Sequence, residues 1–470
     1  MDYDERMERR RQREERESNL ALSDALRNAQ GNYDVYFKMT TNTITTPAPL
    51  PVPSDDENDD NNNDDDDHDD DNGQAEQRPR AYIECEAEEG HRRSNSERPH
   101  RIHSMTNSMT RPQTHARQDE YLVLELEGLY DDTTLEDEIF AQPRPDGSTA
   151  RVKLVRAGLG PKGEGLHKPL SELDDDLCRK VDGLMVFRHY ITVQDLHRFP
   201  KLKALVRSGV GYDRLDRAAL AARNIVVSNV PAYGTNEVAD HTLALILSLR
   251  RGIVMHHERQ RASPPASWSS IDTPLVRRLQ ADTLGLVGLG RIGTAVALRA
   301  KAFGFKILFY DPFLPEGIDK ALQIDRVRTL DALFDQSSVV SIHCPNTKAT
   351  RRLITTDLIN RLQQGSVLVN TARGEIVDTD AVYEGLASGK LAGAGLDVLE
   401  IEPPSEPHIP KLMKAYRAKE SWLEGRLILT PHSAFYSPES FQDIRRMSAE
   451  TLKSTLIDDV PMNVIDPEME

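Results

Sequence analysis

The sequence predicts an α/β protein with two domains, each a mostly parallel sheet flanked by helices, behind a long polar leader. Three observations support this prediction. The chain has 470 residues, more than one ordinary domain. Short aliphatic or β-branched runs alternate with helix-like segments from Tyr121 onward, as in βαβ units. Hydrophobic residues make up only 38% of the chain, and the polar excess lies before about residue 118.

The leader, residues 1–118, contains three segments of biased composition. Residues 5–17 mix Arg with Glu, residues 55–72 form an Asp/Asn tract, and residues 91–117 are rich in Arg, Ser and His. None has an apolar period that could offset the entropy lost on ordering, so we expect disorder. The functional alternative is that the leader docks a partner or is phosphorylated on its serines.

Composition argues against several classes of protein. The formal net charge is −17, but the twelve acidic side chains of residues 55–71 leave only about −5 for the rest, so no nucleic-acid-binding surface is indicated. Three cysteines are too few for a disulfide framework and favour a reducing compartment. The chain shows no apolar run of eighteen residues and no secretory signal. We therefore expect a soluble intracellular protein without a membrane partner.

The first α/β region should contain five strands separated by helix-like or turn-rich segments. The helix-like segments include Thr192–Phe199 and Arg214–Arg223, and a further helical pattern, Pro438–Ile457, ends the chain. The expected strands are Tyr121–Glu127, Arg151–Arg156, Gly183–Phe187, Lys203–Arg207 and Ile225–Ser228.

A helix over Glu237–Arg251 precedes the second region, and it is apolar over most of its surface, as a helix linking two domains would be. The strands that follow are near-continuous apolar runs, which is typical of strands buried on both faces. Six are expected: Leu284–Val287, Lys306–Tyr310, Val339–His343, Ser366–Asn370, Ala394–Val398 and Leu427–Thr430.

Two places match the pattern G-x-G-x-x-G, so the pattern alone decides nothing. In Gly158–Gly163, Pro161 removes an amide and no apolar helix follows, so we interpret this match as a plain turn. The second match lies between the strand Leu284–Val287 and a helix over Ala295–Phe303. A phosphate needs that strand–turn–helix context, because free N–H groups at a helix N-terminus hold it. This loop consists of Gly288, Leu289, Gly290, Arg291, Ile292 and Gly293.

The cofactor expected at this loop is NAD. Gly288 makes the tight turn, Gly290 lets the backbone approach a pyrophosphate, and Gly293 allows close packing of helix on strand. Asp311 ends the next strand, 18 residues after Gly293. A carboxylate there can accept both ribose hydroxyls and would repel a 2′-phosphate, so NAD is favoured over NADP. Together with the strand pattern, this makes the second region a Rossmann-like nucleotide-binding domain.

Three polar segments follow the last strands of this domain: Asn370–Gly374, Asp397–Pro403 and Thr430–Phe435. Because parallel strands end at one edge of a sheet, these loops can converge on one crevice. Oxidation of an alcohol carbon needs a base, for which histidine titrates in a suitable range. An arginine fork can hold a carboxylate and polarise a carbonyl. Spacing alone makes this a weak signal, since a lone histidine is more often structural.

These segments resemble the D-isomer-specific 2-hydroxy acid dehydrogenase family over about residues 195–446. The resemblance implies an NAD-binding domain over residues 233–432, inserted into a flavodoxin-like outer domain of residues 119–232 and 433–460. It is carried by the glycine loop and by Leu205–Gly211, Asn229–Pro231, Asn370–Gly374, Gly395–Asp397 and Thr430–His432.

The same resemblance assigns roles to individual residues. Arg373 would bind the carboxylate and carbonyl of a small 2-keto or 2-hydroxy acid, and His432 would donate or accept the proton. Glu402 would hydrogen-bond His432 and favour its protonated form. Amides near Gly209–Gly211 would meet the substrate carboxylate. The implied cofactor contacts beyond the glycine loop are Val210, Asp311, Cys344, Thr350, Thr371, Ala372, Asp397 and Phe435; no metal is implied.

Within the family, several segments are similar to the C-terminal-binding proteins, a branch of nuclear co-repressors that retained the dehydrogenase fold and senses NAD(H). This similarity implies peptide-motif partners on the outer domain, a homodimer and a nuclear or cytoplasmic location. The chain departs from the branch where Phe435 replaces a tryptophan, Val210 replaces a serine, and residues 409–424 are inserted before His432. The similar segments are Val206–Gly209, Arg299–Phe305, Leu308–Pro312 and Ala434–Ser437.

Two interpretations follow. The first is a co-repressor-like, NAD-sensing scaffold with a retained dehydrogenase site. The second is a metabolic reductase of glyoxylate, hydroxypyruvate or a similar keto acid. Both use Arg373, Glu402 and His432, so active-site residues cannot separate them. The leader favours the scaffold weakly, because metabolic enzymes rarely need such a tail.

Overall fold

The structure, a computed structural model, describes residues 118–128, 130–160 and 167–467. The leader up to residue 117, with its expected disorder, lies outside the described residues. No helix among the described residues is long and apolar enough to cross a membrane.

The first sheet along the chain has five strands, all parallel, in the order β2-β1-β3-β4-β5. This is the flavodoxin-like order, with its switch point between β1 and β3. Helices α3 (Asp175–Cys178), α4 (Val193–Leu196) and α5 (Arg217–Ala222) contribute to the hydrophobic core on one face of this sheet. Helices α2 (Thr134–Phe140) and α14 (Pro438–Leu456) contribute to the core on the other face. The strands are β1 Glu120–Glu125, β2 Arg151–Arg156, β3 Gly183–Val186, β4 Ala204–Arg207 and β5 Val226–Asn229.

A seven-stranded parallel sheet follows, in the order β12-β11-β10-β9-β6-β7-β8, which is Rossmann-like. Its switch point lies between β6 and β9, where the strand order reverses. The strands are β6 Thr283–Val287, β7 Lys306–Tyr310, β8 Asp325–Arg326, β9 Val339–Ile342, β10 Ser366–Asn370, β11 Leu391–Leu396 and β12 Leu427–Leu429.

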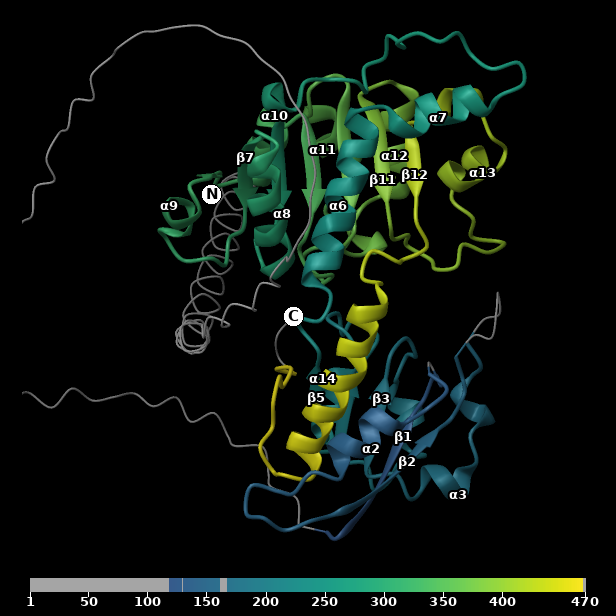
Figure 1. Ribbon diagram of the computed structural model, residues 1–470, viewed down its shortest axis with the longest axis vertical. Helices are drawn as coiled ribbons and strands as arrows, with labels where there is room; N and C mark the ends of the chain where they lie inside the picture. Colours follow the sequence, from purple (N-terminus) through teal and green to yellow (C-terminus); the bar gives the residue numbers. More distant parts are fainter. Residues whose placement is uncertain (1–117, 129, 161–166, 468–470) are drawn as a thin grey trace, which may run out of the picture. The chain divides into compact units, whose positions relative to one another are not determined.

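The strand β10 shows why the strands of this sheet are unbroken apolar runs in the sequence. Val367 and Val369 pack toward α6 and α8, while Leu368 packs toward α10, α11 and α12 on the other face. Because both faces are covered, each residue of the strand is buried whichever way it points. Figure 1 shows α6 and α8 along one face of this sheet.

The two long helices, α6 and α14, agree with the predicted segments in position and length, whereas α4 and α5 are shorter than predicted. Helix α14 begins where Ser437 caps it, with Pro438 in the first turn, and it packs against the five-stranded sheet. The described helices are α2 Thr134–Phe140, α3 Asp175–Cys178, α4 Val193–Leu196, α5 Arg217–Ala222, α6 Thr235–Arg250, α7 Ile253–Arg261, α8 Arg291–Ala302, α9 Ile318–Leu322, α10 Leu330–Gln336, α11 Thr356–Arg361, α12 Thr379–Ala387, α13 Lys411–Arg417 and α14 Pro438–Leu456.

The prediction of two α/β sheets is confirmed, and the structure adds details that the sequence pattern missed. Strand β8 was not expected, because a two-residue polar segment carries no apolar run. The insertion before His432 is structured by α13, with Leu412 and Ala415 packed into the core of the seven-stranded sheet. The exact domain boundaries given above stay a prediction.

Candidate active site

The glycine loop connects β6 to α8, and each of its glycines has a separate steric reason. Gly288 has φ +91, which favours glycine, and a Cβ there would also press on the backbone of His343 and Cys344. A Cβ at Gly293 would overlap the Gly288 carbonyl oxygen. A Cβ at Gly290, in contrast, would meet nothing within 4 Å. Open space over Gly290 at the start of a helix fits a pyrophosphate, so these residues suit NAD.

Asp311, after β7, is held against this loop by the backbone. Its Oδ2 accepts a hydrogen bond from the Leu289 N–H at 2.9 Å, and its Oδ1 accepts one from Phe313 N–H at 3.0 Å. Each carboxylate oxygen keeps a second lone pair, so the geometry leaves acceptors for ribose hydroxyls.

The other glycine match has a packing explanation. Gly158 has φ +66, and a Cβ at Gly160 would overlap the carbonyl oxygen of Glu127, two residues after the end of β1. These glycines therefore allow the chain to pass close to a neighbouring strand end. The remainder of the match, residues 161–163, lies outside the described residues, so the prediction of a plain turn is tested only in its first half.

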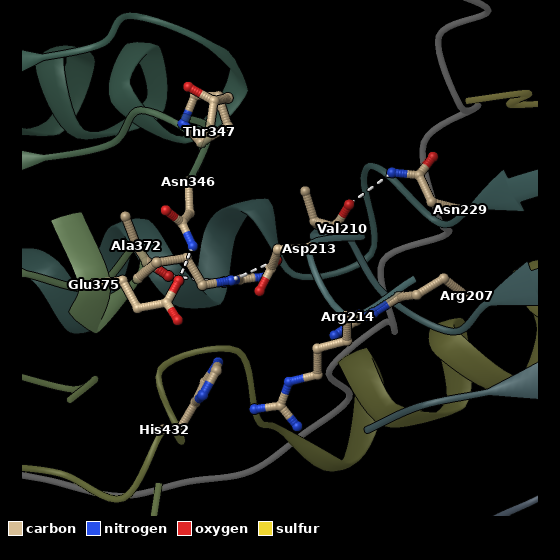
Figure 2. Close-up of polar contacts among 12 residues, drawn as sticks. Arg207, Val210, Asp213, Arg214, Asn229, Asn346, Thr347, Ala372, Glu375 and His432 are labelled. Atoms are coloured by element: carbon tan, nitrogen blue, oxygen red, sulfur yellow. Dashed lines mark hydrogen bonds and ion pairs between the residues drawn. The ribbon is translucent and has the colours of Figure 1, made fainter. Parts of the chain in front are cut away.

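A cavity of about 510 Å³ lies at the carboxyl ends of strands from both sheets. Figure 2 shows side chains from both sheets around part of it. The predicted residues that line it are Val210, Gly290, Arg291, Ile292, Cys344, Thr371, Ala372, Arg373, Asp397, Glu402, His432 and Phe435. Four predicted residues do not line it: Gly288, Gly293, Asp311 and Thr350.

His432 and Glu402 form a hydrogen-bonded pair on the cavity wall. His432 Nδ1 lies 2.7 Å from Glu402 Oε2, and the Leu399 N–H donates to Glu402 Oε1 at 3.0 Å. Burial raises the pKa of Glu402, but the hydrogen bond and charge of His432 outweigh it and lower that pKa below its ordinary value. Glu402 is therefore an anion that holds a proton on Nδ1. Nε2 has no hydrogen-bond partner among the described residues.

The backbone around His432 is held in an uncommon conformation. His432 has φ +53, in the left-handed region that non-glycine residues rarely adopt. Its N–H donates to Asp397 O at 2.7 Å, and the Asp397 carboxylate accepts from Thr430 Oγ1, Ser433 N–H and Ala434 N–H at 2.6 to 3.0 Å. Asp397 is thus buried and engaged with the loop that carries His432.

Arg373 follows β10 and reaches a carboxylate from the other sheet. Its Nε lies 3.0 Å from Asp213 Oδ1, and its NH1 donates to Ala372 O at 2.7 Å. Burial raises the pKa of Asp213, but the charge and hydrogen bond of Arg373 lower it overall. A Cβ at Gly211 would overlap the Arg373 guanidinium, so glycine at this position leaves room for it.

Several side chains expected at the cofactor have local partners. Thr371 Oγ1 lies 2.8 Å from Thr242 Oγ1, and Thr350 Oγ1 donates to Pro345 O at 2.6 Å. Burial raises the pKa of Cys344 to about 12, so that side chain is a neutral thiol. Val210 presents its carbonyl to Asn229 Nδ2 at 2.7 Å. Phe435 stacks edge-on against His432 and Phe187.

The sequence interpretation missed the charged side chains that the five-stranded sheet contributes. Arg188 follows β3, Arg207 ends β4, and Arg214 follows it; all three line the cavity with Asp213 and Tyr233. Arg214 NH2 lies 3.8 Å from the Glu402 oxygen that contacts His432. Figure 2 shows the Arg214 guanidinium and the His432 ring turned toward the same space. Their position at parallel strand ends was the available signal.

Three residues in loops beside the five-stranded sheet, Glu127, His167 and His189, form a possible metal site, since their potential ligand atoms lie within 4.8 Å of one another. Both ring nitrogens of His189 are engaged, Nδ1 with Glu127 Oε1 at 2.8 Å and Nε2 with Lys168 O at 2.9 Å. A carbonyl and a carboxylate only accept, so both nitrogens donate and neither has a lone pair for a metal. Glu127 and His189 therefore form an ion pair, and Glu127 also holds the backbone after β3 in place.

Comparisons with known proteins agree with this site. Residues 243–434 match the model of the "D-isomer specific 2-hydroxyacid dehydrogenase, NAD binding domain" family. Glyoxylate reductase of Korarchaeum cryptofilum is 37% identical over 275 residues, which cover 57% of this chain and 78% of that protein. C-terminal-binding protein 1 of Caenorhabditis elegans is 33% identical over 285 residues, 60% of this chain but only 38% of that protein.

A solved structure extends the agreement to the fold. D-lactate dehydrogenase from Aquifex aeolicus, solved with NAD and lactic acid, shares 30% identity with a TM-score of 0.58 over 72% of this chain and 96% of its own. The expected family and cofactor are confirmed by these matches. The chain belongs to the D-isomer specific 2-hydroxyacid dehydrogenase family, and it carries that family's NAD binding domain.

Proposed function

We propose that the protein interconverts D-2-hydroxy acids and 2-oxo acids with NAD(H). The observation that carries this proposal is the placement of His432, Glu402 and Arg373 on one cavity beside the glycine loop. An acid–base group, an anion-binding fork and a dinucleotide loop are the parts that this reaction needs.

His432 is the proposed proton donor in the direction of reduction and the acceptor in the direction of oxidation. With Nδ1 held by Glu402 at 2.7 Å, Nε2 is the nitrogen left to exchange a proton with the substrate oxygen. Glu402 positions the ring through this hydrogen bond. NAD(H), when bound, supplies or accepts the hydride at the substrate carbon.

Arg373 is the proposed anchor for the substrate carboxylate and the polariser of its carbonyl. Asp213 fixes the guanidinium through Nε, which leaves NH2 without a hydrogen-bond partner among the described residues. A fixed fork preorganises positive charge where negative charge develops on the carbonyl oxygen. Gly290, Arg291 and Ile292 are proposed to meet the pyrophosphate, and Thr371, Ala372, Asp397 and Val210 the nicotinamide end.

The names of the relatives suggest small substrates. One relative is a glyoxylate reductase and another structure is a D-lactate dehydrogenase with lactic acid. The test is oxidation of NADH by the full chain with glyoxylate, pyruvate and hydroxypyruvate. Turnover should disappear in Arg373→Ala and His432→Ala, with Arg151→Ala, at an 82% exposed position, as the control. Undiminished turnover in either active-site variant would refute its assigned role.

A second candidate function is an NAD(H)-sensing co-repressor scaffold, favoured by the 285-residue similarity to C-terminal-binding protein 1. In this case the protein would be nuclear, dimeric with NAD(H) bound, and would dock short peptide motifs. A pulldown from nuclear extract, with and without NADH, tests this. Recovery of chromatin enzymes only with NADH would support the scaffold, and recovery of none in either condition would argue against it.

A further inference from the structure

The charges that line the cavity do not balance on the side of the five-stranded sheet. Asp213 pairs with Arg373 at 3.0 Å. Glu402 is shared between His432 at 2.7 Å and Arg214 at 3.8 Å. Within the part of the chain that the structure describes, neither Arg188 nor Arg207 has a carboxylate at ion-pair distance. These two guanidinium groups therefore have no ion-pair partner among the described residues.

These two arginines are held by neutral groups. Arg188 NH2 lies 3.5 Å from His432 O, and Arg207 NH1 donates to Ser208 O at 3.1 Å. Their guanidinium carbons lie 5.4 and 5.7 Å from the centre of the Phe187 ring. Carbonyl oxygens and an aromatic face orient a guanidinium but do not neutralise it.

Both arginines are partly buried in the cavity wall. Burial lowers the pKa of Arg188, and it lowers the pKa of Arg207 to about 10. Both groups stay cationic at neutral pH. Tyr233, which also lines the cavity, is exposed to the charges of Arg207, Arg373 and Arg188 together. A partly desolvated charge without an ion-pair partner is costly, so an anion brought by a ligand would be stabilised there.

The phosphates of the cofactor do not fill this role, because they have a loop of their own. Gly290 and Arg291 belong to the seven-stranded sheet, while Arg188 and Arg207 stand at the ends of β3 and β4 in the other sheet. The carboxylate of a simple 2-oxo acid supplies one negative charge. Two uncompensated guanidinium groups beyond Arg373 call for another.

We propose that Arg188 and Arg207 form a second anion subsite, so that the preferred substrate is a 2-oxo acid with another anionic group at its far end. The inference rests on the proposed dehydrogenase function and names its substrate class. The second group is a carboxylate, as in a 2-oxo dicarboxylate, or a phosphate.

The first measurement compares pairs of substrates that differ only in the far group. The full chain is assayed with NADH and 2-oxoglutarate against its neutral match 2-oxopentanoate, and with 3-phosphohydroxypyruvate against hydroxypyruvate for the phosphate arm. One charge-assisted contact is worth about 10- to 100-fold in kcat/KM, so an anionic substrate should exceed its neutral match by that factor. The larger gain identifies the carboxylate or the phosphate. Equal kcat/KM within both pairs overturns the inference.

The second measurement assigns the preference to the two arginines. In Arg188→Gln and Arg207→Gln, kcat/KM for 2-oxoglutarate should fall about 10- to 100-fold, while that for 2-oxopentanoate changes little. Arg151→Gln, at the exposed start of β2, is the control. An equal fall for both substrates would overturn the subsite. If neither variant folds, the comparison of substrates on the wild-type chain decides.

Failure of the proposed function is distinguishable from failure of this inference. Absence of turnover with every 2-oxo acid would count against the dehydrogenase. Calorimetric titration of the NAD-loaded protein with 2-oxoglutarate and 2-oxopentanoate would still decide the subsite. Tighter binding of the dianion by about 10-fold supports it, and equal binding refutes it.

Discussion

Two Glu–His pairs lie at the ends of the two sheets, and they have almost the same geometry. Glu402 and His432 are 2.7 Å apart, and Glu127 and His189 are 2.8 Å apart. The first pair is on the cavity, with side chains 23% and 24% exposed. The second is buried, with side chains 0% and 6% exposed. Nε2 of His432 makes no hydrogen bond to the described residues and is available to the substrate, whereas both ring nitrogens of His189 hydrogen-bond within the fold.

The comparison shows that a short Glu–His distance does not define a catalytic pair. Glu127 accepts hydrogen bonds from the N–H groups of Phe187, Arg188 and His189, so it shapes the turn after β3. Glu402 receives one backbone N–H, from Leu399. What separates the structural pair from the reactive one is the number of further hydrogen bonds made by the histidine Nε2 and by the carboxylate.

The largest expected effect is on catalysis, from Glu402→Gln. Removal of the carboxylate takes away the anionic acceptor that lies 2.7 Å from His432 Nδ1 and orients the ring. We expect kcat for 2-oxo acid reduction to fall by about 10²- to 10⁴-fold, with KM changed much less, because the ring is no longer held toward the substrate. Steady-state kinetics measure both constants. An unchanged kcat would show that Glu402 does not position His432.

Glu127→Gln should instead reduce stability. Breaking a buried ion pair by removing one partner costs about 3 to 5 kcal/mol, because the other charge stays buried. Denaturant unfolding of the full chain measures the loss in free energy of unfolding. Glu120→Gln, at the exposed end of β1, is the control. If Glu127→Gln unfolds like wild type yet loses turnover, the contrast between the two pairs is wrong.

The buried pair should also make stability depend on pH in a defined window. Burial lowers the pKa of His189, but the bond and charge of Glu127 raise it overall above 6.5. Burial raises the pKa of Glu127, and His189 lowers it overall below 4.5. A histidine whose pKa is raised by folding loses its contribution to the free energy of unfolding as the pH rises above 6.5. A carboxyl group whose pKa is lowered by folding loses its contribution as the pH falls below 4.5.

The pair therefore contributes most between about pH 4.5 and 6.5. The difference in unfolding free energy between wild type and His189→Gln should be larger at pH 5.5 than at pH 9. A difference that is constant over this range would mean that the charge on His189 is not what stabilises the turn.

Sequence reasoning reached one side of the cavity and missed the other, for physical reasons. The glycine loop, Arg373 and His432 lie in loops whose strands are unbroken apolar runs, so their positions at strand ends could be predicted. Arg188 and Asp213 could not be assigned, since their partners in the cavity, His432 and Arg373, lie 160 or more residues away. The Glu127–His189 pair, 62 residues apart, was missed for the same reason. Arg207 was missed because nothing in the sequence shows that it faces the same cavity.

The smallest expected effect concerns Asp311, a carboxylate that combines both roles of the comparison. Like Glu127 it accepts backbone N–H groups, from Leu289 and Phe313, and like Glu402 it is proposed to act on a ligand. Asp311→Asn keeps an acceptor for one of these amides while it removes the charge that would repel a 2′-phosphate. We expect the ratio of kcat/KM with NADH to that with NADPH to fall by about 10-fold.

Asp325→Asn, on the edge strand β8, is the control. Because both substitutions remove one negative charge from the same sheet, a change confined to Asp311→Asn reports contact with the ribose rather than net charge. An unchanged ratio would reduce Asp311 to a purely structural carboxylate, of the kind that Glu127 represents.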